Sequence, residues 1–111
     1  MVVIHNDELG ASHCVHLSGE LNIYSAAETR EELLQILQAH QQLQVVLAGV
    51  EDFDTSGVQL LLVLKREALR QNKPVTFIRH STVVGEVLDL LNLRDELGDS
   101  TSVLSTHGEG R

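Results

Sequence analysis

The stretch DFDTSGVQLLLVLKREA, residues 52–68, joins a buried strand to a long helix. Gln44 to Ala48, just before it, forms a short run rich in aliphatic and β-branched residues, and this predicts a buried strand. From Gly57 to Gln71 the apolar residues recur at helical spacing, which predicts an α-helix. A strand followed directly by a helix is typical of α/β folds.

Two hydroxyls, an acid and a glycine crowd the junction between strand and helix, in the order Asp54, Thr55, Ser56 and Gly57. Ser56 is followed three residues later by Gln59, so one interpretation is a capping box with Ser56 as the N-cap. The other interpretation is a site, because α/β folds often place sites where a strand ends and a helix begins. On this second view Gly57 leaves room beside Ser56 for a partner to approach.

Outward from this stretch, the same periodicities predict further strands and helices. We expect additional strands at residues 2–5, 13–17 and 75–78 and helices at 26–40 and 82–91, with turns at 6–8 and 18–21 and a last short strand at SVLS, residues 102–105. Ser25 with Glu28 forms a second capping-box pattern, and Ser81 or Thr82 caps the third helix. Strands alternating with helices predict an α/β class, and the opening hairpin makes the sheet mixed. We expect one domain over residues 2–104 and a loose tail over 105–111.

The composition excludes several classes of function. The net charge is −8, from 16 acidic and 8 basic residues, which disfavours nucleic acid and anionic membranes as partners. No apolar run reaches the roughly 20 residues that span a bilayer, and the first residues do not form a signal peptide. The single cysteine excludes an internal disulfide, and together these features favour a cytoplasmic protein.

Catalytic and metal sites are weakly supported. Cys14 and His16 would share one face of a strand while His13 points to the other, and two ligands do not complete a zinc site, so we expect no metal. Asp54 and Ser56 with a histidine could imitate a hydrolase triad, but the chain lacks the G-x-S-x-G elbow. We therefore expect neither enzyme activity nor a cofactor.

The helix after Ser56 has apolar residues around about 200° of its surface, whereas one core stripe needs about half of that. Burial from two directions explains this pattern. The alternative is that the excess near Leu60 or Leu62 is solvent-accessible and faces a partner.

The sequence resembles the STAS domains, the family of bacterial anti-sigma factor antagonists. The resemblance lies in DFDTSGVQLLLVLKREA and in the earlier LSGELNIYSAAETREEL, and it extends over nearly the whole chain. It implies a mixed sheet of four to five strands with helices packed on one face. It also implies that Ser56, directly before the glycine, accepts a phosphate. The implied contact surface consists of Asn22, Asp54, Thr55, Ser56, Gly57 and Leu60.

By the same resemblance, the unmodified protein binds an anti-sigma factor or serine protein kinase of the histidine-kinase-like ATPase fold. Phosphorylation releases that partner and a serine phosphatase reverses the change, while a homodimer is left open. The alternative is a constitutive scaffold subunit of a chemosensory or transporter-ATPase complex, in which Ser56 serves only as a cap. Many relatives have Asp at the position of Asn22, so the resemblance leaves the choice of partner open here.

Between Glu20 and Asp54 the only Lys or Arg is Arg30, inside a predicted helix. We therefore expect no local cluster of cations to hold a phosphate, and the nearby acids Glu51 and Asp52 would repel it. Phosphorylation is expected to spoil an interface and not to order a loop.

Overall fold

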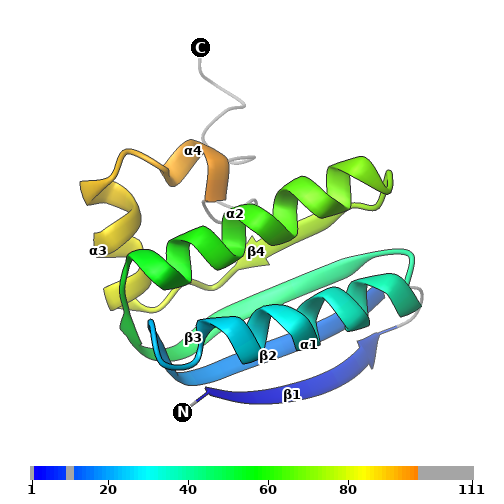
Figure 1. Ribbon diagram of the computed structural model, residues 1–111, viewed down its shortest axis with the longest axis horizontal. Helices are drawn as coiled ribbons and strands as arrows, with labels where there is room; N and C mark the ends of the chain where they lie inside the picture. Colours follow the sequence, from blue (N-terminus) through cyan, green and yellow to red (C-terminus); the bar gives the residue numbers. More distant parts are fainter. Residues whose placement is uncertain (1, 10–11, 98–111) are drawn as a thin grey trace.

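The computed structural model describes residues 2–9 and 12–97, which form four strands and four helices (Figure 1). The elements in chain order are β1 (Val2–Leu9), β2 (Ser12–Leu21), α1 (Ala26–Ala39), β3 (Leu43–Phe53), α2 (Thr55–Arg70), β4 (Val75–Ile78), α3 (Thr82–Leu90) and α4 (Arg94–Leu97). No helix in these two ranges is both long enough and apolar enough to cross a bilayer.

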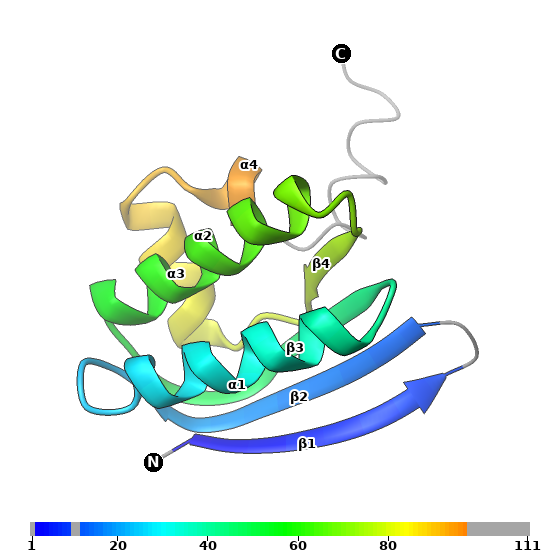
Figure 2. The same cartoon turned by 45° about the vertical axis from the view of Figure 1, so that its right-hand side comes forward.

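The strands form one mixed sheet in the order β1-β2-β3-β4. β1 pairs with β2 antiparallel, whereas β2–β3 and β3–β4 are parallel pairs joined by α1 and α2. Because both helices connect parallel strands, they run in the same direction, and they lie side by side over the sheet (Figures 1 and 2). The first turns of α1 and α2 therefore meet at the end of the sheet where β2 and β3 finish.

All four helices contribute to one hydrophobic core on one face of the sheet. Alternate residues of β2 and β3, including Val15, Leu17, Val45 and Leu47, point into this core and are almost fully buried. The helices contribute Leu33 and Leu37, Leu61 and Leu64, Val84 and Leu88, and Leu97 to the same cluster. This confirms the expected α/β class and the mixed sheet covered by helices on one face.

The strands are longer than the sequence patterns predict. β1 and β2 pair continuously from Val2↔Gly19 to Leu9↔Ser12, so the turn expected at residues 6–8 is wrong. The turn expected at 18–21 is also wrong, because β2 runs on to Leu21. Gly19 has a φ of 96° and lies where the β2–β3 register shifts, so a bulge absorbs the glycine without ending the strand.

The predicted helices are present with small changes at their ends. α3 begins after Ser81, whose hydroxyl accepts a hydrogen bond from the Val84 N–H at 3.3 Å, which confirms Ser81 as the N-cap. α4 follows α3 and was not predicted from the sequence, since four residues are too few to show a helical period. The SVLS strand and the tail at 105–111 lie outside the described residues.

Candidate functional site

Two loops meet where β2 and β3 end, and the Asp54 carboxylate joins them. One oxygen of Asp54 accepts hydrogen bonds from the backbone N–H groups of Ser56 at 2.9 Å and Gly57 at 3.3 Å. The other oxygen accepts from the Ile23 N–H at 3.2 Å, in the loop before α1. Asp54 therefore caps α2 and also fixes the loop of α1 beside the first turn of α2.

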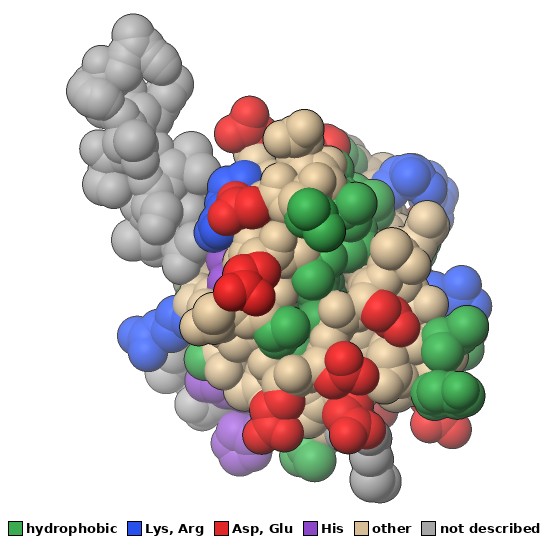
Figure 3. Space-filling model, turned by 90° about the vertical axis from the view of Figure 1, so that its left-hand side faces the viewer, with side chains coloured by type: hydrophobic (Ala, Val, Ile, Leu, Met, Phe, Trp, Pro, Cys, Tyr) green, Lys and Arg blue, Asp and Glu red, His purple; other side chains and the backbone are tan. Residues whose placement is uncertain are grey.

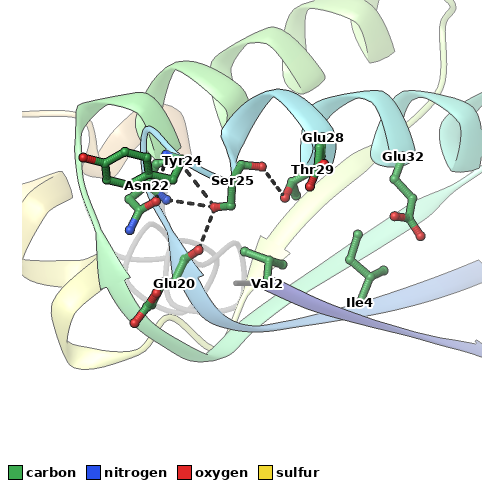
Figure 4. A pocket seen from close by; sticks show the side chains of 9 residues that line it. All are labelled: Val2, Ile4, Glu20, Asn22, Tyr24, Ser25, Glu28, Thr29 and Glu32. Atoms are coloured by element: carbon green, nitrogen blue, oxygen red, sulfur yellow. Dashed lines mark hydrogen bonds between the residues drawn. The ribbon is translucent and has the colours of Figure 1, made fainter.

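Asp54, and not Ser56, is the N-cap of α2, so the capping box predicted at Ser56 is wrong. Asp is as good an N-cap as Ser, and with Asp54 in that position Thr55 and Ser56 fall within the first turn of the helix. The capping box predicted at Ser25 is wrong as well, because its side chain makes no cap bond. The Ser25 hydroxyl instead donates to the Glu20 carbonyl at 2.7 Å and accepts from the Asn22 N–H at 3.2 Å, which closes the loop (Figure 4).

This assignment predicts different stability effects for two neighbouring substitutions. We expect Asp54→Ala to lower the free energy of unfolding by about 1–2 kcal/mol, because α2 loses its cap. We expect Ser56→Ala to change it by less than about 0.5 kcal/mol, because the Ser56 side chain caps nothing. Urea denaturation of both variants measures the difference. A greater loss of unfolding free energy in Ser56→Ala than in Asp54→Ala would show that Ser56, and not Asp54, caps the helix.

Asn22 occupies the turn after β2 and forms a second link between the loops. Its Nδ2 donates to a carboxylate oxygen of Asp52 at 2.9 Å, and its Oδ1 accepts from the Tyr24 N–H at 2.9 Å. An aspartate at position 22 could accept from Tyr24 but could not donate to Asp52. The asparagine therefore makes both hydrogen bonds, whereas an aspartate could make only one of them.

Replacing this asparagine tests the Asn22–Asp52 bond directly. Asn22→Asp removes one hydrogen bond and places two carboxylates side by side, so we expect a loss of about 0.5–1.5 kcal/mol in the free energy of unfolding. The double variant Asn22→Asp/Asp52→Asn should recover most of the loss, because it restores one donor and one carboxylate. A single variant as stable as the wild type would show that the Asn22–Asp52 bond does not hold the loop.

Gly57 packs α2 against the sheet and does not provide the space for a partner predicted from the sequence. It is buried, and a Cβ atom built at this position would lie 2.7 Å from the Phe53 ring and 2.9 Å from the Leu21 carbonyl oxygen. The first turn of α2 therefore approaches β2 and β3 as closely as a residue without a side chain allows.

Leu60 or Leu62 was expected to be solvent-accessible, and Leu60 is not, because it is 3% exposed and belongs to the core. Leu62 is half-buried and packs against the same core. The wide apolar arc of α2 arises because the helix is covered on one side by the sheet and on another by α1. Lys65 on α2 also donates a hydrogen bond to the Glu96 carbonyl of α4.

A groove runs between the first turns of α1 and α2, and Ser56 lines it. Its volume is about 310 Å³, and its walls are formed by Ile23, Ala26, Ala27, Arg30, Ser56, Gln59, Leu60 and Val63. The largely buried Leu60 side chain lies at the bottom of the groove, and Thr55 is exposed beside the groove. Of the residues predicted as a contact surface, Asn22, Asp54, Thr55 and Ser56 lie together at this end, and Gly57 and Leu60 lie beneath them.

Three further residues at this site were not predicted from the sequence. Ile23 and Tyr24 are 67% and 91% exposed in the loop before α1, although large apolar side chains are usually covered. Their position in the short segment NIYS, between the predicted strand and the predicted helix, was the available signal. Figure 3 faces this end of the molecule and shows hydrophobic side chains at the surface beside Asp and Glu. Arg30 is the third residue, and it lines the groove with Ser56.

A second cavity, also of about 310 Å³, lies on the other side of the first turn of α1. Glu20, Glu28 and Glu32 line it together with Val2 and Ile4 of β1 (Figure 4). Its acidic walls would repel an anionic ligand, so it does not suit a phosphate group.

The histidines around Cys14 lie as the strand pattern predicts. Cys14 and His16 share the outer face, with Sγ and Nε2 at 3.6 Å, while His13 points to the other face and stacks on His40 with ring centroids 3.8 Å apart. In residues 2–9 and 12–97, no group of three or more His, Cys, Asp or Glu side chains is placed to hold a metal ion.

A mixed four-stranded sheet with two parallel helices over one face and a serine at the start of the second helix defines a class of small α/β domains. The sequence matches the family described as Mlab, STAS domain, over residues 4–104. The chain therefore belongs to the STAS domain family, as the resemblance predicted.

Solved structures share the fold. An anti-sigma factor antagonist from Mycobacterium paratuberculosis matches with a TM-score of 0.75 and 15% identity, covering 87% of this chain and 83% of that one. The anti-sigma factor antagonist SpoIIAA in its unphosphorylated form matches with a TM-score of 0.70 and 19% identity, covering 98% of this chain and 100% of that one. The Bacillus cell fate determinant SpoIIAA in the phosphorylated form matches with a TM-score of 0.66 and 18% identity, covering 87% and 90%. No curated protein sequence matches the chain.

Proposed function

We propose that this STAS domain binds a partner protein through the loop before α1 and the first turns of α2, and that phosphorylation of Ser56 switches the binding off. The observation that carries the proposal is the position of Ser56. Its side chain lines a groove of about 310 Å³ next to the exposed Ile23, so a partner seated there would contact the hydroxyl.

The partner that fits this proposal is an anti-sigma factor or serine protein kinase of the histidine-kinase-like ATPase fold. The support is that solved structures with this fold are anti-sigma factor antagonists, one in an unphosphorylated and one in a phosphorylated form. The Ser56 Oγ would attack the γ-phosphorus of ATP, ADP would leave, and the hydroxyl proton would pass to a base of the kinase. A serine phosphatase would return the hydroxyl by hydrolysis.

The predicted site residues take two kinds of role. Asn22, Thr55 and Ser56 lie at the surface and would contact the partner, with Ile23 and Tyr24 supplying apolar area. Asp54, Gly57 and Leu60 act from beneath, because Asp54 fixes both loops and the other two pack α2 against the core. The partner would therefore meet a surface that is already ordered in the unbound protein, and this lowers the entropic cost of binding.

The experiment that tests this function maps the modified residue. The protein would be isolated from its own cells with whatever it binds, incubated with ATP, and analysed by mass spectrometry. We expect phosphate on Ser56 in the wild type and in Thr55→Ala, and none in Ser56→Ala. Phosphate on Thr55 alone, or on neither residue while the partner stays bound, would overturn the proposed switch.

A constitutive scaffold subunit of a chemosensory or transporter-ATPase complex is the second candidate. It is favoured by the family description, which names Mlab and not an anti-sigma factor antagonist. In that case the same surface would bind its partner permanently, and the bound partner would remain after ATP is added. The mapping experiment therefore separates the two functions.

A further inference from the structure

Among the described residues that line the groove with Ser56, Arg30 is the only cation. The sequence offered no reason to pair them, since 26 positions separate the two residues and Arg30 stands alone. The fold brings them together because α1 and α2 both follow parallel strands and start at the same end of the sheet. We propose that Arg30 holds the phosphate of phosphorylated Ser56 in an ion pair that spans this groove and closes it. This inference rests on phosphorylation of Ser56, as proposed above.

The direction of helical side chains favours this pairing. Arg30 lies one turn beyond Ala26 on α1, and helical side chains lean toward the N-terminus of their helix. A guanidinium that follows this tendency would extend back toward the first turn of α2, and Arg30 and Ser56 both line the groove between the two helices. Arg30 is exposed, and in residues 2–9 and 12–97 it makes no hydrogen bond or ion pair that would hold it elsewhere.

The chemistry of the two groups is complementary. A phosphoserine carries about −1.5 to −2 charges at neutral pH and three acceptor oxygens, and a guanidinium donates to two of these oxygens at once. The Gln59 side chain also lines the groove and can donate from its amide. Before phosphorylation Ser56 carries no charge for Arg30 to pair with, so the bridge depends on the modification.

Closure of the groove adds to the effect of charge. A phosphate–guanidinium pair would lie across the apolar walls formed by Ala26, Leu60 and Val63, and would cover them. A partner side chain that fills the groove in the unmodified protein could then no longer enter it. The phosphorylated domain would thus differ from the unmodified one in shape as well as in charge.

The test measures the second pKa of the phosphate itself. Phosphoserine would be installed at position 56 during translation, and the phosphorus NMR shift would be followed across pH 4–9 in the otherwise wild-type chain and in Arg30→Gln. We expect Arg30→Gln to raise this pKa by about half a unit or more, because the nearby cation that favours the dianion is lost. Arg30→Lys should retain part of the shift, since a lysine keeps the charge and loses the bidentate fork.

Arg66→Gln is the matched control. Arg66 is exposed on α2 and lies ten residues, or about 15 Å, beyond Ser56, which is more than the screening length of about 8 Å at physiological salt. We expect almost no shift for this variant. The acidic groups near the phosphate, Glu51 and Asp52 on β3 and Asp54 at the N-cap of α2, are the same in all variants and cancel in the comparison.

Equal phosphate pKa values for the wild type, Arg30→Gln and Arg66→Gln would overturn the ion pair. Equal shifts in both variants would also overturn it, because they would show a general effect of net charge. The phosphate is installed without a kinase or partner, so a failure here leaves the phosphorylation switch intact. Conversely, Arg30→Gln could raise the phosphate pKa although cells never phosphorylate the chain. That result would support the ion pair and overturn the phosphorylation switch.

Discussion

Gly57→Ala will destabilise the domain by about 1–3 kcal/mol, although alanine is normally the better residue inside a helix by about 1 kcal/mol. The added methyl group would lie 2.7 Å from the Phe53 ring and 2.9 Å from the Leu21 carbonyl oxygen. Phe53 is 4% exposed in the core, and the Leu21 carbonyl belongs to the backbone at the end of β2. Neither group can move away without shifting the sheet or the first turn of α2.

Gly85→Ala is the matched control, because Gly85 is also a buried glycine near the start of a helix. A methyl group there would lie 3.1 Å from the Arg94 guanidinium, the end of a flexible side chain that donates to Asp89 and to the Gly85 carbonyl and would have to shift by only a few tenths of an ångström. We expect Gly85→Ala to leave the free energy of unfolding unchanged or to raise it. Urea denaturation of both variants makes the comparison. Equal stability of the two would contradict the close packing of α2 on the sheet.

The second large effect is expected on partner binding. Ser56→Asp places a permanent negative charge in the groove, and the partner must bury that charge or leave it unpaired in the interface. We expect its affinity to fall by about 100-fold or more, which corresponds to about 3 kcal/mol. Ser56→Ala should bind nearly as well as the wild type, because it adds no charge to the groove and leaves the cap of α2 intact.

Gln35→Glu controls for a change in net charge alone. Gln35 is exposed on α1 and does not line the groove, so the added carboxylate lies outside the proposed contact. Calorimetric titration of the co-purifying partner with the three variants should give a large loss only for Ser56→Asp. A comparable loss for Gln35→Glu would indicate that the partner responds to overall charge and not to position 56.

The sequence predicts the topology well because the helices and strands have distinct periods. The helical spacing after Gly57 and the aliphatic run before Glu51 are long enough to define α2 and β3. The ends of strands are predicted less well, since polar residues on an edge strand look like a turn in sequence. Asn6 lies within β1 for this reason, and Gly19 lies within a bulge of β2.

The site is only partly predictable, because its decisive contacts join residues that are far apart in sequence. The sequence contains two good caps before α2, Asp54 and Ser56, and only the fold shows that the Asp54 carboxylate also reaches Ile23. Leu60 is buried because α2 is packed from more than one side, which a single helical pattern does not reveal. The same holds for Arg30, whose position beside Ser56 follows from the parallel direction of α1 and α2.

The central claim is that phosphate on Ser56 releases a partner that the unmodified surface binds. The most direct measurement is a calorimetric titration of the partner, recovered with the Ser56→Ala protein as bait, into the unmodified chain and into the chain with phosphoserine installed at position 56. The account predicts tight binding to the unmodified chain and an affinity at least about 100-fold weaker for the phosphorylated one. Equal affinities for the two would contradict it and would favour the constitutive scaffold.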